Sequence, residues 1–284
     1  MGFITLEVPA PAMQCLDLDR LNETVLAERE RFAAAAPFPH VVLDDLLYPD
    51  VADAVVREFD AARDGWQFFQ HFNEKKIALN DPSRMGPASR AVIADLQSDA
   101  FVRALDRLVG IEGLLADPEL DGGGLQQTLP GGFLNVHTDF LAHSKRRTWS
   151  RQVNLLLFLN KEWEESHRGW LEFWDPRVTR CVRRIEPIFN RCVVFRTSAT
   201  SFHGVPAGVA CPEGDSRKSI ALYYFRDEGK TCPLRPTRYV PLPGDSALRR
   251  ALIRADRWLI AGYSFMKRYT PLRDAMASKI LKHL

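Results

Sequence analysis

The chain has 284 residues, of which 46% are hydrophobic and 26% charged, and its formal net charge is +2. This composition is ordinary for a globular protein with a sizeable core, and the length suits one large domain with helical additions. A net charge this close to zero argues by itself neither for nucleic acid nor for a membrane as a partner. The five cysteines are scattered without a Cys-x-x-Cys pair, so we expect no disulfide framework and no zinc knuckle.

No targeting or membrane-spanning segment is expected either. The first residues, MGFITLEVPAPAMQ, lack a positive region followed by an apolar run. No stretch approaches the ~20 apolar residues that a spanning helix needs. We therefore expect a cytoplasmic protein with no membrane partner, and the sequence makes no prediction of its oligomeric state.

The first part of the chain, 1–121, is predicted to be a mainly helical support with one or two strands. Apolar residues recur at intervals of three and four in three segments, and Pro49-Asp50 is a helix start signal before the second. These predicted helices cover 18–36, 51–64 and 89–110. Short strands are predicted at His40–Leu43 and in the aromatic segment 66–73.

From 122 to 226 the pattern changes to short β-type runs broken by turns. The runs are FLNVHTDF, RQVNLLLFLN, GWLEFWD, RCVVFRT and KSIALYYF. Strands this short and this dense predict a sandwich or barrel of antiparallel sheets. RQVNLLLFLN is apolar on both faces, which is typical of a central strand that is covered on both sides.

After a turn at PLPGD, residues 245–284 are predicted to form a basic helical extension. They hold nine Lys or Arg against three Asp. Leu248, Leu252, Ala255 and Leu259 form one apolar stripe at helical spacing, which predicts that the stripe packs on the core. Nucleic acid is not an expected partner; binding of the basic helices to an anionic surface is the alternative to core packing with solvated charges.

The triplet His137-Thr138-Asp139 is the first candidate for chemistry. Alternate residues of a strand share a face, so His137 and Asp139 point the same way. Two neutral histidine nitrogens and one carboxylate suit Fe(II) and leave three adjacent positions open. His203, which follows another predicted strand, is the candidate third ligand. Arg217, at the start of the next strand, is placed to bind a dicarboxylate cosubstrate bidentately.

The segment just after this triplet concentrates basic side chains. Arg147, Trp149 and Arg151 are candidate contacts for a substrate carboxylate or phosphate, and a solvated hairpin tip is the alternative. His143, in the same segment, is not expected to be a metal ligand. The aromatic segment 66–76 either covers the mouth of the pocket or packs in the core.

Together these motifs resemble a known family. HTD, then HGV, then R-x-S-I-x-L-Y-Y-F, with RQVNLLLFLN and GWLEFWD between them, are similar to the Fe(II)- and 2-oxoglutarate-dependent oxygenases, in particular to the prolyl-4-hydroxylase-like branch. The resemblance covers roughly 122–226 and extends back through PFPHVVLDDLLYPDVADAVVREF. It implies a double-stranded β-helix, or jelly roll, with flanking helices.

The resemblance also implies a site. Fe(II) would be bound by His137, Asp139 and His203, 2-oxoglutarate would chelate the iron, and O2 would be the second cosubstrate. Arg217 would hold the distal carboxylate of 2-oxoglutarate; Lys218 beside it, a residue type that some members use, is expected to face solvent. Further cosubstrate contacts are expected from three residues, with the glutamine in place of the tyrosine of other members: Asn154, Leu156 and Gln127.

The implied reaction is hydroxylation of an unactivated C–H bond of an amino acid, peptidyl or small biosynthetic substrate, with release of succinate and CO2. Halogenating relatives carry a small residue where Asp139 stands, so its carboxylate indicates oxidation. A non-catalytic metal-binding jelly roll that recruits a partner through its basic tail is the alternative, and Arg217 argues against it because a structural metal needs no carboxylate anchor. A cupin-type metalloenzyme is a third hypothesis, which the His-x-Asp spacing disfavours.

Overall fold

The structure is a computed structural model that describes residues 14–62, 64–233 and 235–269. The expectation about a leader segment and the last part of the predicted C-terminal extension, 270–284, lie outside these ranges. In the described part, no helix is long and apolar enough to cross a membrane.

Five α-helices are described, and local sequence signals explain where they begin. Asp17 caps the first helix by accepting hydrogen bonds from two backbone N–H groups, and Pro49 opens the second. Ser98 caps the fourth by accepting from the Phe101 N–H at 3.2 Å. The helices are α1 (Leu18–Ala34), α2 (Pro49–Ala61), α3 (Pro87–Leu96), α4 (Asp99–Val109) and α5 (Ala247–Tyr269).

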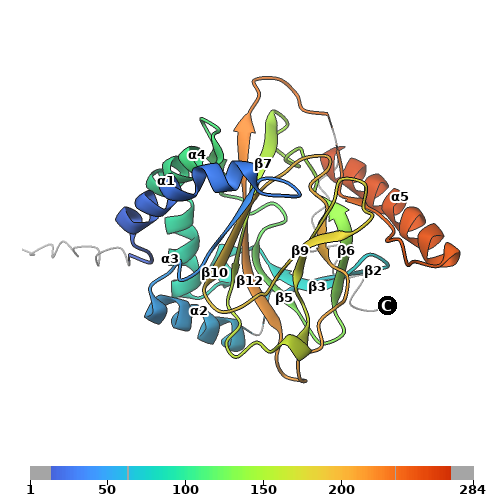
Figure 1. Cartoon of the computed structure of the whole chain (residues 1–284), viewed down its shortest axis with the longest axis horizontal. Helices are drawn as coiled ribbons and strands as arrows, with labels where there is room; N and C mark the ends of the chain where they lie inside the picture. Colours follow the sequence, from blue (N-terminus) through green and yellow to red (C-terminus); the bar gives the residue numbers. More distant parts are fainter. Residues whose placement is uncertain (1–13, 63, 234, 270–284) are drawn as a thin grey trace, which may run out of the picture.

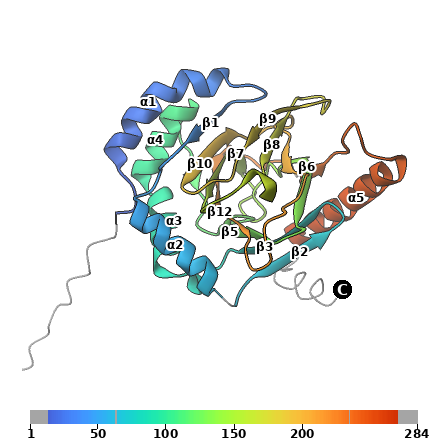
Figure 2. The same ribbon diagram turned by 60° about the horizontal axis from the view of Figure 1, so that its bottom comes forward.

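The strands form one curled, almost entirely antiparallel sheet. They are β1 (His40–Leu43), β2 (Gln67–His71), β3 (Glu74–Leu79), β4 (Leu115–Ala116), β5 (Gly124–Thr128), β6 (Phe133–Thr138), β7 (Trp149–Phe158), β8 (Leu171–Trp174), β9 (Cys181–Ile185), β10 (Arg191–Arg196), β11 (His203–Val205), β12 (Arg217–Asp227) and β13 (Arg238–Tyr239). The order β10-β7-β12-β5 forms one half and β6-β11-β8-β9 the other, with β3 joining β5 to β6. The two halves curl around a common interior (Figure 2). This is the expected jelly roll.

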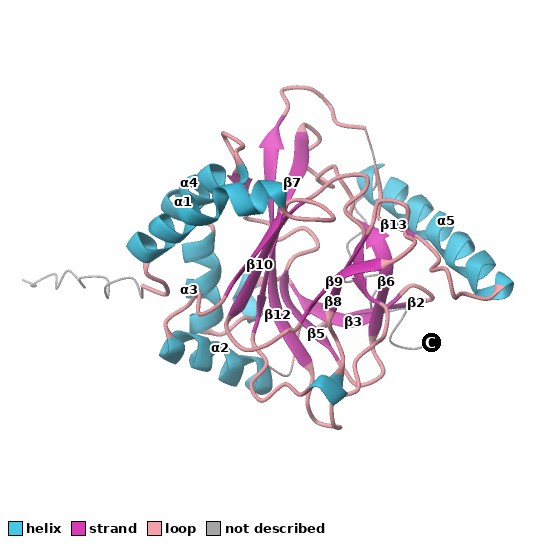
Figure 3. Ribbon diagram, in the orientation of Figure 1, coloured by secondary structure: helices cyan, strands magenta, loops and turns pink. Residues whose placement is uncertain are grey.

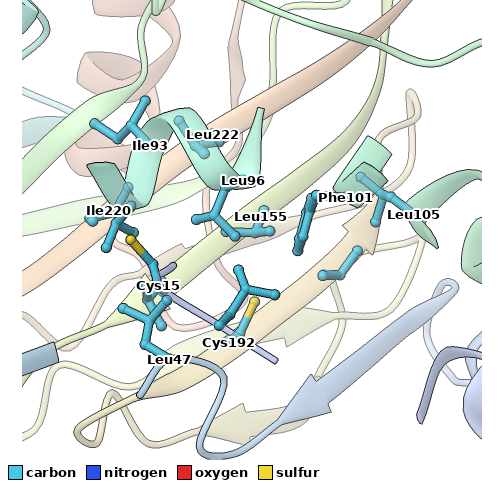
Figure 4. Packing of buried hydrophobic residues seen from close by; sticks show 14 of the residues in the cluster. Cys15, Leu47, Ile93, Leu96, Phe101, Leu105, Leu155, Cys192, Ile220 and Leu222 are labelled. Carbon is cyan, nitrogen blue, oxygen red and sulfur yellow. The ribbon is translucent and has the colours of Figure 1, made fainter. Parts of the chain in front are cut away.

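The helices α1 to α4 cover the outer side of the β10-β7-β12-β5 half, and α5 lies on the opposite side of the molecule (Figures 1 and 3). β7 is central, as predicted, between β10 and β12. Its Val153, Leu155 and Leu157 point to the helices and belong to the main hydrophobic cluster, part of which is drawn in Figure 4. Asn154 and Leu156 point the other way and line a cavity inside the roll. The pleat of this strand therefore separates core residues from site residues.

Three features differ from the sequence-based expectation. The segment 89–110 is two helices, because Ser98 caps α4 and interrupts an apolar period that continues on both sides. β3 was not predicted, since it begins with three charged residues instead of an apolar run. β9 was not predicted either; it is an edge strand with two arginines, and charge is common on strands that have no partner on one side.

The orientation of α5 is the fourth difference. The stripe that was predicted to pack on the core faces outward, with exposed fractions of 71% for Leu248, 41% for Leu252 and 73% for Leu259. The buried side of the helix instead carries Ile253 and Asp256. The helix is held by polar contacts, so its apolar periodicity does not mark the buried face.

A hydrogen bond joins the sheet to the helical layer and gives a test of this packing. The buried hydroxyl of Tyr224 donates to the carbonyl of Leu96, the last residue of α3, at 2.7 Å. We expect Tyr224→Phe to lower the free energy of unfolding by about 1–2 kcal/mol in urea denaturation, because it removes a buried bond without changing the ring packing. Tyr223→Phe is the control; its hydroxyl bonds the Gly122 carbonyl at an exposed position, so a loss below about 0.5 kcal/mol is expected. Equal losses in the two variants would contradict this account.

Candidate metal centre and cavity

The structure brings together the three predicted metal ligands from two neighbouring strands. His137 lies near the end of β6, Asp139 follows that strand, and His203 opens β11. His203 is directly opposite His137 in the antiparallel register of the two strands. One possible ligand atom from each residue lies within 4.8 Å of the others, and the two imidazole centroids are 4.5 Å apart. All three side chains are nearly or fully buried.

Both histidines are held in one tautomer by the backbone. The Nδ1–H of His137 donates to the Asn135 carbonyl at 2.9 Å, and that of His203 to the Ser201 carbonyl at 3.0 Å. A carbonyl can only accept, so in the neutral form of each imidazole the lone pair is on Nε2. These Nε2 atoms lie 3.5 and 3.4 Å from the Asp139 carboxylate oxygens, which are acceptors too. Three acceptors therefore converge without a proton between them, and a cation satisfies such a group.

The electrostatics favour the ligand-competent protonation states. Burial lowers the pKa of His203 to about 4, although Asp139 opposes the shift, so the imidazole is neutral at neutral pH. Burial raises the pKa of Asp139, but the positive charge of Arg151, with smaller contributions from His203 and His137, outweighs this and holds the pKa well below its usual range. The carboxylate is therefore ionised.

Asn154 and Arg151 of β7 orient that carboxylate. The Asn154 amide donates to Asp139 at 2.7 Å and accepts from Nε of Arg151 at 2.7 Å. The Arg151 guanidinium packs against the ring of Tyr223, 3.3 Å from its centroid, and lies 4.6 Å from that of Phe140. Its buried Nη2 lies 3.4 Å from Asp139 and has no hydrogen-bond partner among the described residues. Arg151 is three residues from Asn154, so regular alternation would place it on the opposite face of β7. A shift in the β7–β12 register next to Arg151 turns its side chain toward the cavity instead.

Arg217 lies in the wall of the same cavity, as the strand alternation predicts. It is buried, donates through Nε to the Gly169 carbonyl at 2.7 Å and lies over the Phe158 ring. Across the described chain, no carboxylate is within ion-pair distance of it, and burial lowers its pKa to about 10. A buried guanidinium without a counter-ion is costly, so this position is suited to an anionic ligand.

Two expectations about neighbouring residues are wrong. Lys218 points away from the cavity as predicted, but it is buried instead of solvated and pairs with Asp215 at 2.9 Å. Gln127 does not line the cavity; it shares a face of β5 with the core residue Leu125 and accepts a hydrogen bond from Ser216. Gln126 lines the cavity in its place. The error is one residue of register, which exchanges the two faces of a strand.

The cavity has a volume of about 550 Å³ and reaches from the convergent acceptors to the surface at α5. Asn154 and Leu156 lie in its wall as predicted. Its walls also contain residues that the sequence did not single out, since they come from β3, the segment after Thr237, and α5. These are Glu74, Lys76, Ala78, Asn80, Thr237, Tyr239, Asp256 and Leu259. Phe68, Phe69 and His71 of β2 line it too, which favours the interpretation of the segment 66–76 as part of the pocket mouth.

A charged network crosses the cavity wall and reaches α5. His71 contacts Asp256 through Nδ1 at 2.8 Å and Glu74 through Nε2 at 3.3 Å. Lys76 and the Tyr239 hydroxyl also contact Glu74, at 2.7 and 3.1 Å. Burial opposes protonation of His71, but the bonds to both carboxylates outweigh it and raise the pKa of His71 to about 9. Its ring therefore bridges two strands and a helix as an imidazolium.

The basic segment after Asp139 divides into two parts. Arg151 lines the cavity, whereas Arg147 is exposed and Trp149 is half-buried, and neither belongs to the cavity lining. His143 is not part of the acceptor cluster, as expected. It is buried, pairs with Asp117 at 3.2 Å and accepts from the Lys145 N–H, so it orders the loop.

Comparison with known proteins agrees with this geometry. Residues 123–225 match the family model described as the 2OG-Fe(II) oxygenase superfamily. This segment belongs to that superfamily. The resemblance inferred from the sequence is thereby confirmed, and with it the family's cofactors, Fe(II) and 2-oxoglutarate, with O2 as cosubstrate. None of the curated proteins matches the sequence.

Solved structures show that this oxygenase-superfamily core has the fold of the prolyl hydroxylases. A prolyl-4-hydroxylase from Pseudomonas putida is similar with a TM-score of 0.53 and 20% identity, covering 72% of this chain and 99% of that one. A prolyl hydroxylase from Trichoplax adhaerens, in complex with a hypoxia inducible factor peptide fragment, has a TM-score of 0.50 and 18% identity, covering 75% of this chain and 91% of that one.

The raised pKa of His71 makes a prediction about stability. The contribution of the protonated His71 to the free energy of unfolding is complete below pH 6.5, the ordinary pKa of histidine. It is lost as the pH rises through about 9, the pKa of His71 in the folded protein. Between these limits we expect the free energy of unfolding to fall by roughly 1–3 kcal/mol more in the native protein than in His71→Gln. Urea denaturation at several pH values measures the difference. His167→Gln, at a partly exposed turn, is the control and should keep the native pH dependence; the same slope in His71→Gln would refute the network.

Proposed function

We propose that this protein is an Fe(II)- and 2-oxoglutarate-dependent dioxygenase that hydroxylates a C–H bond of a small-molecule or peptidyl substrate. The observation that carries the proposal is the pairing of two unsatisfied groups in one cavity. One is the cluster of three acceptors, and the other is the buried Arg217 without a counter-ion.

His137, Asp139 and His203 would hold the iron. Two neutral imidazoles and a carboxylate are the donor set that suits non-haem Fe(II), and they leave open positions for other ligands. Only these three residues form such a cluster in the described ranges. A structural zinc site usually has a fourth protein ligand, so the open site favours catalysis over the non-catalytic alternative. Asn154 would fix the carboxylate orientation through its 2.7 Å bond to Asp139.

Arg217 would bind the distal carboxylate of 2-oxoglutarate. Its Nε is held by the Gly169 carbonyl, which leaves the terminal nitrogens of the guanidinium for a bidentate contact. Ser219, two residues further along β12, lies in the same wall and supplies a hydroxyl. Leu156 would cover the carbon chain from β7.

With iron and 2-oxoglutarate bound, O2 would supply one oxygen atom to succinate and one to the product alcohol, with loss of CO2. The residues of this chain would bind and orient the reactants and exclude water. The apolar part of the cavity wall near the acceptor cluster is formed by Phe140, Tyr223 and Leu134. The free Nη2 of Arg151 would donate to an acceptor group of the substrate.

The proposal can be tested first by ligand binding. Under anaerobic conditions, Fe(II) and 2-oxoglutarate together should produce the weak visible charge-transfer band of an iron-chelated keto acid. His137→Ala and Asp139→Ala should lack the band and lose succinate formation by at least about 100-fold, because each removes one of three ligands. His167→Ala, which changes a histidine outside the cavity, should behave as the native protein. A native-like band in either ligand variant would show that the iron binds elsewhere.

A second test separates Arg217 from its neighbour. Arg217→Met should raise the concentration of 2-oxoglutarate that half-saturates the band by about 100-fold, since a charge-assisted bidentate contact contributes roughly 2–3 kcal/mol. Lys218→Met is the matched control on the opposite face of β12 and should leave this concentration unchanged. If the lysine variant had the larger effect, the assignment of the cosubstrate anchor would be wrong.

A further inference from the structure

The outer surface of α5 is unusual because it is apolar where a surface helix is normally polar. We define the outer face of α5 by Leu248, Leu252, Trp258 and Leu259, which have exposed fractions between 41% and 73%. In the described part of the chain, ten large apolar side chains are exposed, and five of them lie on this one helix. Such a concentration marks an interaction surface.

The buried side of α5 is already occupied, so the helix cannot turn its apolar residues inward without losing polar contacts. Asp256 accepts from the Asn73 amide at 2.6 Å and contacts His71. Arg249 donates to the Asn135 side chain at 3.2 Å, and Asn73 donates to the Ile253 carbonyl at 3.3 Å. These contacts hold the outer face toward solvent.

Arginines border the outer face along one edge. Arg250, Arg254 and Arg257 follow each other at spacings of four and three residues, so they lie on one side of the helix. The only carboxylate on α5 among the described side chains is Asp256, which is buried beneath the helix. The surface thus combines an apolar strip with an uncompensated positive edge.

This combination fits an anionic lipid surface. Helices that lie in the membrane interface bury Leu and Trp in the acyl boundary while flanking arginines contact the headgroups. A second copy of the chain fits less well, because a two-fold contact through this face brings identical rows of arginines together. We propose that the outer face of α5 docks on anionic membranes. The sequence analysis gave an anionic surface only as the alternative to core packing of the stripe, and it expected no membrane partner.

Docking in this way has a consequence for the cavity. Leu259 belongs to the outer face and also to the cavity lining, so it lies where the cavity opens. A bilayer in contact with the outer face would therefore lie next to the opening, through which an amphiphilic molecule can enter from the membrane. The docking inference itself does not depend on the iron and 2-oxoglutarate chemistry.

Sedimentation with lipid vesicles tests the proposal on the full chain, without added metal or cosubstrate. We expect binding to vesicles that contain phosphatidylglycerol, at least about 10-fold weaker binding to pure phosphatidylcholine, and weakening with added salt. Leu248→Ser/Leu252→Ser and Arg254→Gln/Arg257→Gln should each reduce the binding by at least about 10-fold. The matched control is Leu26→Ser, which changes a 64% exposed leucine on α1 and should bind as the native protein.

All changed residues are at the surface or along its edge, and unchanged thermal unfolding would show that each variant folds. Absence of binding to phosphatidylglycerol vesicles would overturn the proposal. Equal binding of the native protein and the leucine double variant would also overturn it. Light scattering gives an independent outcome: a dimer that becomes monomeric in the leucine variant would assign the face to a second copy of the chain. Because no turnover is measured, failure here would leave the proposed oxygenase activity untouched.

Discussion

The antiparallel pairing of β6 with β11 is the interaction on which the candidate site depends. It sets His203 opposite His137, and each histidine bonds through Nδ1 to the backbone carbonyl two residues earlier in the chain. The two Nε2 lone pairs must then face the Asp139 carboxylate at 3.4–3.5 Å. Mutually facing acceptors cost free energy in a buried place, so the surrounding sheet has to hold them there. The cluster is therefore suited to hold a cation, and its position is fixed by the surrounding sheet.

The pleat of β7 and β12 lets the same strands stabilise the fold and build the cavity. One face of β12 carries Ile220, Leu222 and Tyr224 into the core under the helices. The other face carries Arg217, Ser219 and Tyr223 into the cavity. Substitutions on the two faces are therefore expected to separate into effects on stability and effects on ligands. The register shift beside Arg151 breaks the alternation at one place only, and there it adds a cation beside Asp139 that simple alternation would direct elsewhere.

Much of this could be predicted from the sequence because strand alternation and ordered motifs are local signals. His137, Asp139, His203 and Arg217 each follow from a strand pattern together with the family resemblance. Gln127 was assigned to the cavity incorrectly because the segment GGGLQQTLPGG has little alternation, and the register of β5 is fixed by its partners β3 and β12. The contribution of β3 was missed for a related reason. Its inward residues Glu74 and Lys76 are charged, and a buried charge pair has no hydrophobic signature in the sequence.

The orientation of α5 shows how a polar contact can override hydrophobic periodicity. An apolar stripe predicts a buried face only if burial of apolar area is the main force that docks the helix. Here the buried side of α5 presents Asp256 to the imidazolium of His71 and the amide of Asn73. If the helix rotated, Asp256 would move away and both groups would lose this partner. The same two residues, His71 and Asp256, also line the cavity. The contact that turns the apolar face outward is therefore part of the cavity wall, so the same polar pair attaches α5 and shapes the site.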